Sequence, residues 1–97
     1  MRKLKFNREP DGKLHIEKHS VTREEVDELL FNTEPVLLEN RQDKTCVMYG
    51  KLKSSGRYLK VYFRKKEEEK DMVYFVITAF DINEQMIIDE LNKMIDY

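Results

Sequence analysis

The chain has little that could cross-link it or carry it through a membrane. Cys46 is its only cysteine among 97 residues, so no disulfide can form within the chain. No apolar run approaches the ~20 residues of a membrane-spanning helix, and the N-terminus, charged from Arg2, lacks the apolar stretch of a signal peptide. We therefore expect a cytoplasmic protein without a membrane segment. Because Cys46 lies in an apolar, strand-like run, we expect its thiol to be buried and inert.

Glycine is also scarce, which excludes one large class of binding site. Gly12, Gly50 and Gly56 are too widely spaced to form a glycine-rich phosphate loop. No serine lies in a nucleophile motif, and nothing marks a catalytic pair among the nineteen acids. His15 and His19 have a spacing that can hold a metal on a helix, but no cysteine, third histidine or obvious carboxylate supports such a site. We expect neither a metal nor a cofactor.

The net charge of −1 conceals a strong segregation of charge along the chain. Residues 41–66 contain nine Lys and Arg against one acid, Asp43. Residues 22–40 contain six acids against one base, and residues 67–97 contain nine acids against two bases. The middle of the chain is therefore basic between two acidic flanks, a distribution that favours a localised anion-binding surface.

The chain is long enough for one domain, residues 1–97, with a modest core. The clearest element is a helix from Arg23 to about Phe31. Thr22 and Glu25 have the spacing of a capping box at its start, and the residue before Pro35 is pushed out of the helical region, which ends it. The remaining expected elements are a strand around Leu4 and Phe6, a short helix over 13–19, the strands Pro35–Glu39, Thr45–Lys53, Arg57–Lys65 and Met72–Ala79, and a last helix capped by Asn83 or Asp81.

These elements predict an α+β domain. We expect the order β-α-α-β-β-β-α, with a twisted, mostly antiparallel sheet and helices packed on one face. Ser54–Gly56 has the length of a hairpin turn, and the highly charged segment Lys65–Lys70 is expected to be a solvated loop at a hairpin tip.

The strand Arg57–Lys65 alternates in a way that bears on function. Arg57, Leu59, Val61 and Phe63 would point to the core, and the residues between them would form a basic and aromatic row on the opposite sheet face. Lysine and arginine can contact phosphates, and tyrosine can stack on unpaired bases. An ordinary solvent-facing surface remains an equal alternative. The candidate nucleic-acid-binding residues are Lys44, Lys51, Lys53, Tyr58, Lys60, Tyr62 and Arg64.

The last helix carries a wide apolar face. Ile87, Ile88, Leu91 and Ile95 lie on it, and most of this face is expected to belong to the core. Its area is large for one terminal helix, so part of it could form a partner interface.

Five segments in order along the chain resemble the BrnT-like toxins of type II toxin–antitoxin systems. They are Lys18–Thr22, Glu24–Val26, Val47–Gly50, Gly56–Phe63 and Val76–Ala79. Each motif is only moderately specific, but they are co-linear over nearly the whole chain. The resemblance implies a RelE-like fold with a basic, RNA-facing surface. It also implies a metal-independent endoribonuclease that works by general acid–base and electrostatic catalysis, blocked by a cognate antitoxin.

The chain departs from that family where charge matters most. Phe75, Phe80, Met86 and Ile87 stand at positions where the family carries charged side chains, and Ser20 replaces a glycine. An apolar side chain cannot neutralise a phosphate.

Two functions therefore remain open. The first is a toxin-family ribonuclease acting on RNA, impaired or with a relocated site, for which His19, Arg57, Lys60 and Arg64 are the candidate catalytic residues. The second is a non-catalytic interaction module that binds a partner, or a second copy as a homodimer, through the last helix.

Overall fold

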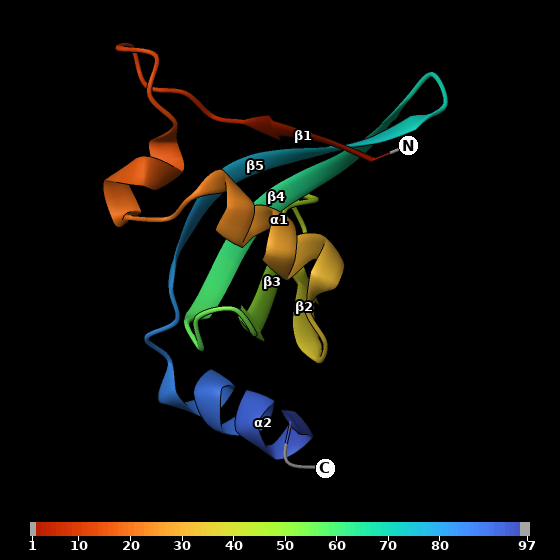
Figure 1. The fold of residues 1–97 in the computed structure, drawn as a ribbon. Helices are drawn as coiled ribbons and strands as arrows, with labels where there is room; N and C mark the ends of the chain where they lie inside the picture. The colour runs from red at the N-terminus through yellow and green to blue at the C-terminus, as the bar shows by residue number, and fades with distance from the viewer. Residues whose placement is uncertain (1, 96–97) are drawn as a thin grey trace.

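The computed structural model describes residues 2–95, which form a five-stranded sheet with helices on both faces (Figure 1). The elements in chain order are β1 (Arg2–Phe6), the 3-10 helix η1 (His15–His19), α1 (Arg23–Asn32), β2 (Val36–Asn40), β3 (Cys46–Lys51), β4 (Tyr58–Glu68), β5 (Asp71–Asp81) and α2 (Gln85–Ile95).

The strands lie side by side in the order β1-β5-β4-β3-β2. Neighbours are antiparallel except for β1, which runs parallel to β5. The predicted α+β class with a mostly antiparallel sheet is confirmed. The predicted element order is wrong by one strand, because four strands separate α1 from α2. Among the described residues, no helix has the length and apolar character needed to cross a membrane.

One face of the sheet carries the larger core, under η1 and α1. Leu59, Val61 and Phe63 of β4 are fully buried there against Val26 and Leu29 of α1, as their alternation predicts. The capping box at the start of α1 is confirmed, since Thr22 Oγ1 accepts from the Glu25 N–H and the Glu25 carboxylate accepts from the Thr22 N–H. This box sets the helix start that positions Val26 and Leu29 over the sheet.

The expectation that all helices pack on one face is wrong for α2. Leu91 of α2 is buried with Val47 and Tyr49 of β3 and with Ile82, and this cluster lies on the face opposite α1. The physical reason lies in β3, where Cys46 and Val47, adjacent residues that face opposite sides of the sheet, are both buried. A strand apolar on both faces needs cover on both.

The charged segment Lys65–Lys70 is mostly strand and not loop, which corrects that expectation. Backbone pairing between β4 and β5 continues through Lys66↔Val73 to Glu68↔Asp71. Only Glu69 and Lys70 turn the chain, with Glu69 at a positive φ of 55°. Charged side chains exposed to water on an extended hairpin do not prevent the backbone from pairing, so the hairpin projects beyond the rest of the sheet (Figure 1).

Both expected caps of the last helix are also wrong. Asp81 is the final residue of β5, and α2 begins at Gln85. The Glu84 carbonyl accepts from the Ile88 N–H, so the helix starts after Glu84 and Asn83 lies outside it. The Asp81 carboxylate is used elsewhere, by Arg57.

Two smaller expectations hold more closely. The segment 13–19 contains η1, which is followed by Ser20 in the left-handed region. Leu14, just before η1, and Ile16, within it, are buried. Cys46 is a buried free thiol, as predicted, and its Sγ lies 3.3 Å from Asn40 Oδ1 as a hydrogen-bond donor.

We predict that Gly50→Ala destabilises the fold by about 1–3 kcal/mol, because a methyl group there overpacks the contact between α1 and β3. Its Cβ would lie 2.6 Å from Leu29 Cδ1 and 3.2 Å from Val36 Cγ1. Urea denaturation of Gly50→Ala, of Leu29→Ala and of the double variant measures this. The added methyl should cost less in the Leu29→Ala background, and strictly additive effects would contradict the overpacking.

Candidate nucleic-acid interface

The sheet face opposite α1 is divided into a half that α2 covers and a half that it leaves open. On the covered half, Tyr58 Oη donates to Asn92 Oδ1 at 2.6 Å, and Lys60 Nζ lies 2.8 Å from Glu84 Oε1. Only 12% of the Lys60 side chain remains exposed. Tyr58 and Lys60, both predicted to contact nucleic acid, thus face the sheet side expected for them, but Tyr58 contacts α2 and Lys60 contacts the residue just before it.

The candidate partner interface on α2 is largely used within the chain. Leu91 is fully buried, and Ile87 and Ile88 pack half-buried against the same sheet cluster. Ile95 is exposed, and Met86, which lies away from the sheet, is 85% exposed. Under this cover, burial first and then the nearby Glu39 carboxylate raise the pKa of Tyr49 to about 12.

Arg57 is engaged by groups from three elements. Its Nε donates to Asp81 Oδ1 at 2.6 Å, its Nη1 contacts both oxygens of Glu25 at 3.0 Å, and its Nη groups donate to the backbone carbonyls of Ser20 and His19. The hydrogen bond to Asp81 first, and the bonds to Glu25 after it, raise the pKa of the guanidinium. This cluster of Arg57, Glu25 and Asp81 joins the start of α1 to β4 and β5.

His19 lies in a row of rings at the edge of the same face. Its ring meets Phe80 edge-on at 4.6 Å between centroids, and Phe80 in turn meets Tyr62 at 5.6 Å. On the other side the His15 ring lies 5.6 Å from His19, and His15 Nδ1 is 2.6 Å from Glu9 Oε1. The two histidines are therefore packed against rings and a carboxylate. No group of three metal-ligating side chains occurs within residues 2–95.

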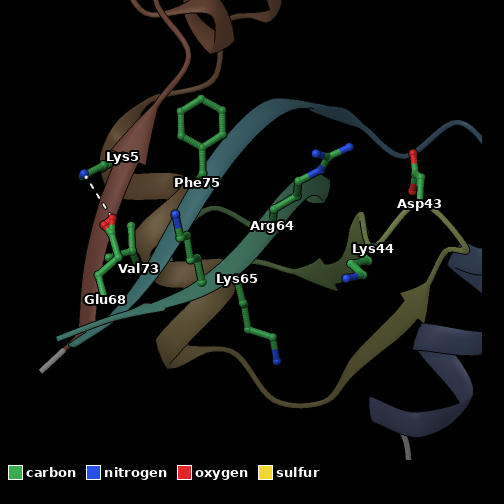
Figure 2. Close-up of a pocket in the computed structure, with 9 residues that line it drawn as sticks. Lys5, Asp43, Lys44, Arg64, Lys65, Glu68, Val73 and Phe75 are labelled. Atoms are coloured by element: carbon green, nitrogen blue, oxygen red, sulfur yellow. Dashed lines mark ion pairs between the residues drawn. The ribbon is translucent and has the colours of Figure 1, made fainter. Parts of the chain in front are cut away.

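The open half of the face contains a hollow of about 530 Å³ (Figure 2). Five cations and two carboxylates surround an apolar floor and wall. Figure 2 shows that the labelled residues come from β1, β4, β5 and the β2–β3 turn. The lining residues are Lys5, Asp43, Lys44, Arg64, Lys65, Lys66, Glu68, Val73 and Phe75.

The cations of this hollow are weakly neutralised. Arg64 contacts Thr45 Oγ1 through Nε at 3.4 Å, and Lys5 lies 3.8 Å from Glu68 in a solvent-exposed pair. Within residues 2–95, Lys44 and Lys66 form no ion pair. The hollow therefore presents a positive potential to solvent.

The hollow brings together only some of the residues expected from sequence. Arg64 and Lys44 line it, whereas Lys51 is the last residue of β3, at the opposite end of the strand from Lys44, and Lys53 follows it. Lys51 Nζ is placed 5.4 Å from the centroid of the Tyr58 ring. Tyr62 lies on the sheet face opposite α1, and the Arg41 guanidinium is 5.0 Å from the centroid of its ring.

Seven of the nine lining residues were not expected as part of a site, among them Lys5, Lys66 and Phe75. Lys5 and Arg64 both lie directly opposite Phe75, on the strands that flank β5. The alternation of residues in each strand indicates which side chains share a face. It does not indicate the pairing register, which decides which residues of neighbouring strands lie side by side. Lys66 lies in the segment expected to be a loop, so the sequence did not place it on the sheet face that contains the hollow.

We predict that Arg57→Lys destabilises the fold by about 1–3 kcal/mol, because lysine cannot reproduce hydrogen bonds from a planar fork to two carboxylates and two carbonyls. Chemical denaturation measures the loss. Arg41→Lys is the matched control, since the one ion pair that Arg41 forms among residues 2–95 is a solvent-exposed contact of 3.5 Å with Glu39. Equal stability of the Arg57→Lys and Arg41→Lys proteins would contradict the role assigned to the cluster.

We also predict that α2 loosens at acid pH. The Lys60 ammonium holds the pKa of Glu84 below its usual value of 4.5. The contact between Lys60 and Glu84 therefore stabilises the folded protein fully at pH values above 4.5. This stabilisation is lost as the pH falls through the lowered pKa that Glu84 has in the folded protein. Amide chemical shifts of α2 followed by NMR during acidification should report this step. The step should vanish in Glu84→Gln and persist in Glu90→Gln, an exposed position within α2. A step that persists in Glu84→Gln or vanishes in Glu90→Gln would refute the prediction.

Comparisons of the chain with protein-family models, with curated proteins and with solved structures found no significant match.

Proposed function

We propose that this chain is a divergent RelE-like protein, related to the BrnT-like toxins, that binds RNA on the open half of its sheet. The observation that carries the proposal is the hollow in which Arg64, Lys44, Lys66 and Lys5 gather around Phe75. The resemblance of the motifs around His19 and along β4 supports RNA as the ligand.

The electrostatics of the face support a polyanion as ligand. Two of the surrounding lysines, Lys44 and Lys66, have no ion-pair partner within residues 2–95, and Arg64 uses only its Nε. A phosphate backbone would displace counterions from these cations and gain free energy in doing so. The acids of the chain are gathered elsewhere, in residues 22–40 and 67–97, although Asp43 and Glu68 reach the rim.

The positions of the candidate catalytic residues favour RNA binding over RNA cleavage. Arg57 donates to Asp81 and Glu25, Lys60 is held by Glu84, and the His19 ring packs on Phe80. Only Arg64 lines the hollow. General acid–base cleavage needs groups within hydrogen-bond reach of one phosphodiester, so we propose a binding protein whose ancestral metal-independent endoribonuclease activity is impaired.

A toxin ancestry also implies a protein partner. We propose that a cognate antitoxin, encoded beside this gene, would compete with RNA for the hollow. With three of its four candidate interface residues packed on the sheet, α2 offers little apolar surface for that partner or for a homodimer.

We predict that single-stranded RNA binds with an affinity that falls steeply with salt, and that Arg64→Gln or Lys66→Gln weakens it. Each lost phosphate contact should reduce the slope of log K against log salt by about 0.7. Fluorescence anisotropy with a labelled oligoribonucleotide measures both quantities.

Lys53→Gln is the matched control, because Lys53 is exposed and lies outside the hollow. It should leave the affinity and the slope close to those of the parent protein. Gel analysis of the RNA after incubation, with and without EDTA, reads cleavage in the same samples, and we expect intact RNA. Equal RNA affinity of the Arg64→Gln, Lys66→Gln and Lys53→Gln proteins would refute the hollow as the RNA-binding surface. Cleavage of the RNA that persists in EDTA would refute the proposal that the ribonuclease activity is impaired.

A further inference from the structure

The hollow contains an apolar ring where a simple phosphate site needs none. Phe75 is 42% exposed on β5, and Val73, two residues earlier on the same face, is buried as part of the floor. We propose that the Phe75 ring is a stacking platform for one unpaired nucleobase, so that the hollow selects single-stranded RNA over duplex. This inference rests on the proposed function and names the form of RNA that the site accepts.

The ring is open to a stacking partner. Other aromatic rings of the fold are occupied: Arg2 lies over Phe31, Arg23 over Phe6 and Lys60 over Phe80. Within residues 2–95, neither a cation nor a second ring is placed against Phe75. A flat apolar surface exposed in this way can receive the π-face of any base, and such stacking is tolerant of sequence.

Cations flank the ring on both sides at the distance of neighbouring strands. Lys5 on β1 and Arg64 on β4 each pair directly with Phe75 in the sheet register, and adjacent strands lie about 4.8 Å apart. Figure 2 shows Phe75 and Arg64 projecting from adjacent strands. Base and phosphate of one nucleotide can therefore contact ring and cation together, an arrangement typical of single-strand binding surfaces.

A duplex cannot use this arrangement. Its bases are already stacked on their neighbours, so a base reaches a protein ring only after unstacking, which costs a few kcal/mol. The cations alone would still hold its phosphates, and duplex RNA should therefore bind, but more weakly than a single strand of the same sequence.

The test is affinity for a single strand and for its duplex, measured for the parent protein and for variants of Phe75. Phe75→Ala should weaken single-strand binding about 5- to 150-fold and leave duplex binding nearly unchanged. Phe75→Leu keeps an apolar side chain without a π-face and should also lose selectivity, whereas Phe75→Trp should retain or increase it. Quenching of a 2-aminopurine base in the strand reports the stack directly.

Leu38→Ala is the matched control, because Leu38 is another exposed apolar residue, on the edge strand β2. Circular dichroism and thermal unfolding check that each variant folds. Equal single-strand affinity for Phe75→Ala and the parent, or full selectivity in Phe75→Leu, would overturn the stacking proposal. If Arg64→Gln and Lys66→Gln still weaken binding in that case, the RNA-binding function stands without the stack.

Discussion

The rest of the fold depends on the anchorage of the helical layer to the sheet at Arg57. Its guanidinium gathers the Glu25 carboxylate, the Asp81 carboxylate and the carbonyls of His19 and Ser20. Glu25 is also the capping-box residue of α1, so one carboxylate both starts the helix and ties it to β4. Because the Arg57 and Glu25 side chains are only 22% and 20% exposed, the hydrogen bonds between them are stronger than those of a surface pair.

The same anchorage explains why an arginine that looks functional in sequence serves structure. Arg57 follows the turn at Gly56 and has the alternation of the core-facing set, and its fork is filled by protein groups. Lys60 presents a parallel case, since Glu84 places a carboxylate on its ammonium. In both, a protein carboxylate contacts the cation, and the weakly neutralised charge is left at Arg64, Lys44 and Lys66.

α2 decides how much of the sheet is available. Its apolar stripe covers Val47, Tyr49 and Tyr58, leaving the half of the face that carries Phe75 open. The phenylalanines at 75 and 80 then have different roles. Phe80 is packed between His19 and Tyr62, whereas Phe75 faces solvent among cations. The two phenylalanines therefore lie in different surroundings, and only Phe75 leaves its ring open to solvent.

Local elements of this protein are determined by the sequence itself, because they depend on neighbours within one turn or one strand. The capping box at Thr22, the alternation of Leu59, Val61 and Phe63, and the burial of Cys46 were all readable in this way. The side of the sheet that α2 covers, the extent of the β4–β5 hairpin and the meeting of Lys5, Phe75 and Arg64 were decided by tertiary structure. Each depends on strand register or on a helix docking far along the chain, and a period-2 pattern specifies faces within a strand but not which strands lie side by side.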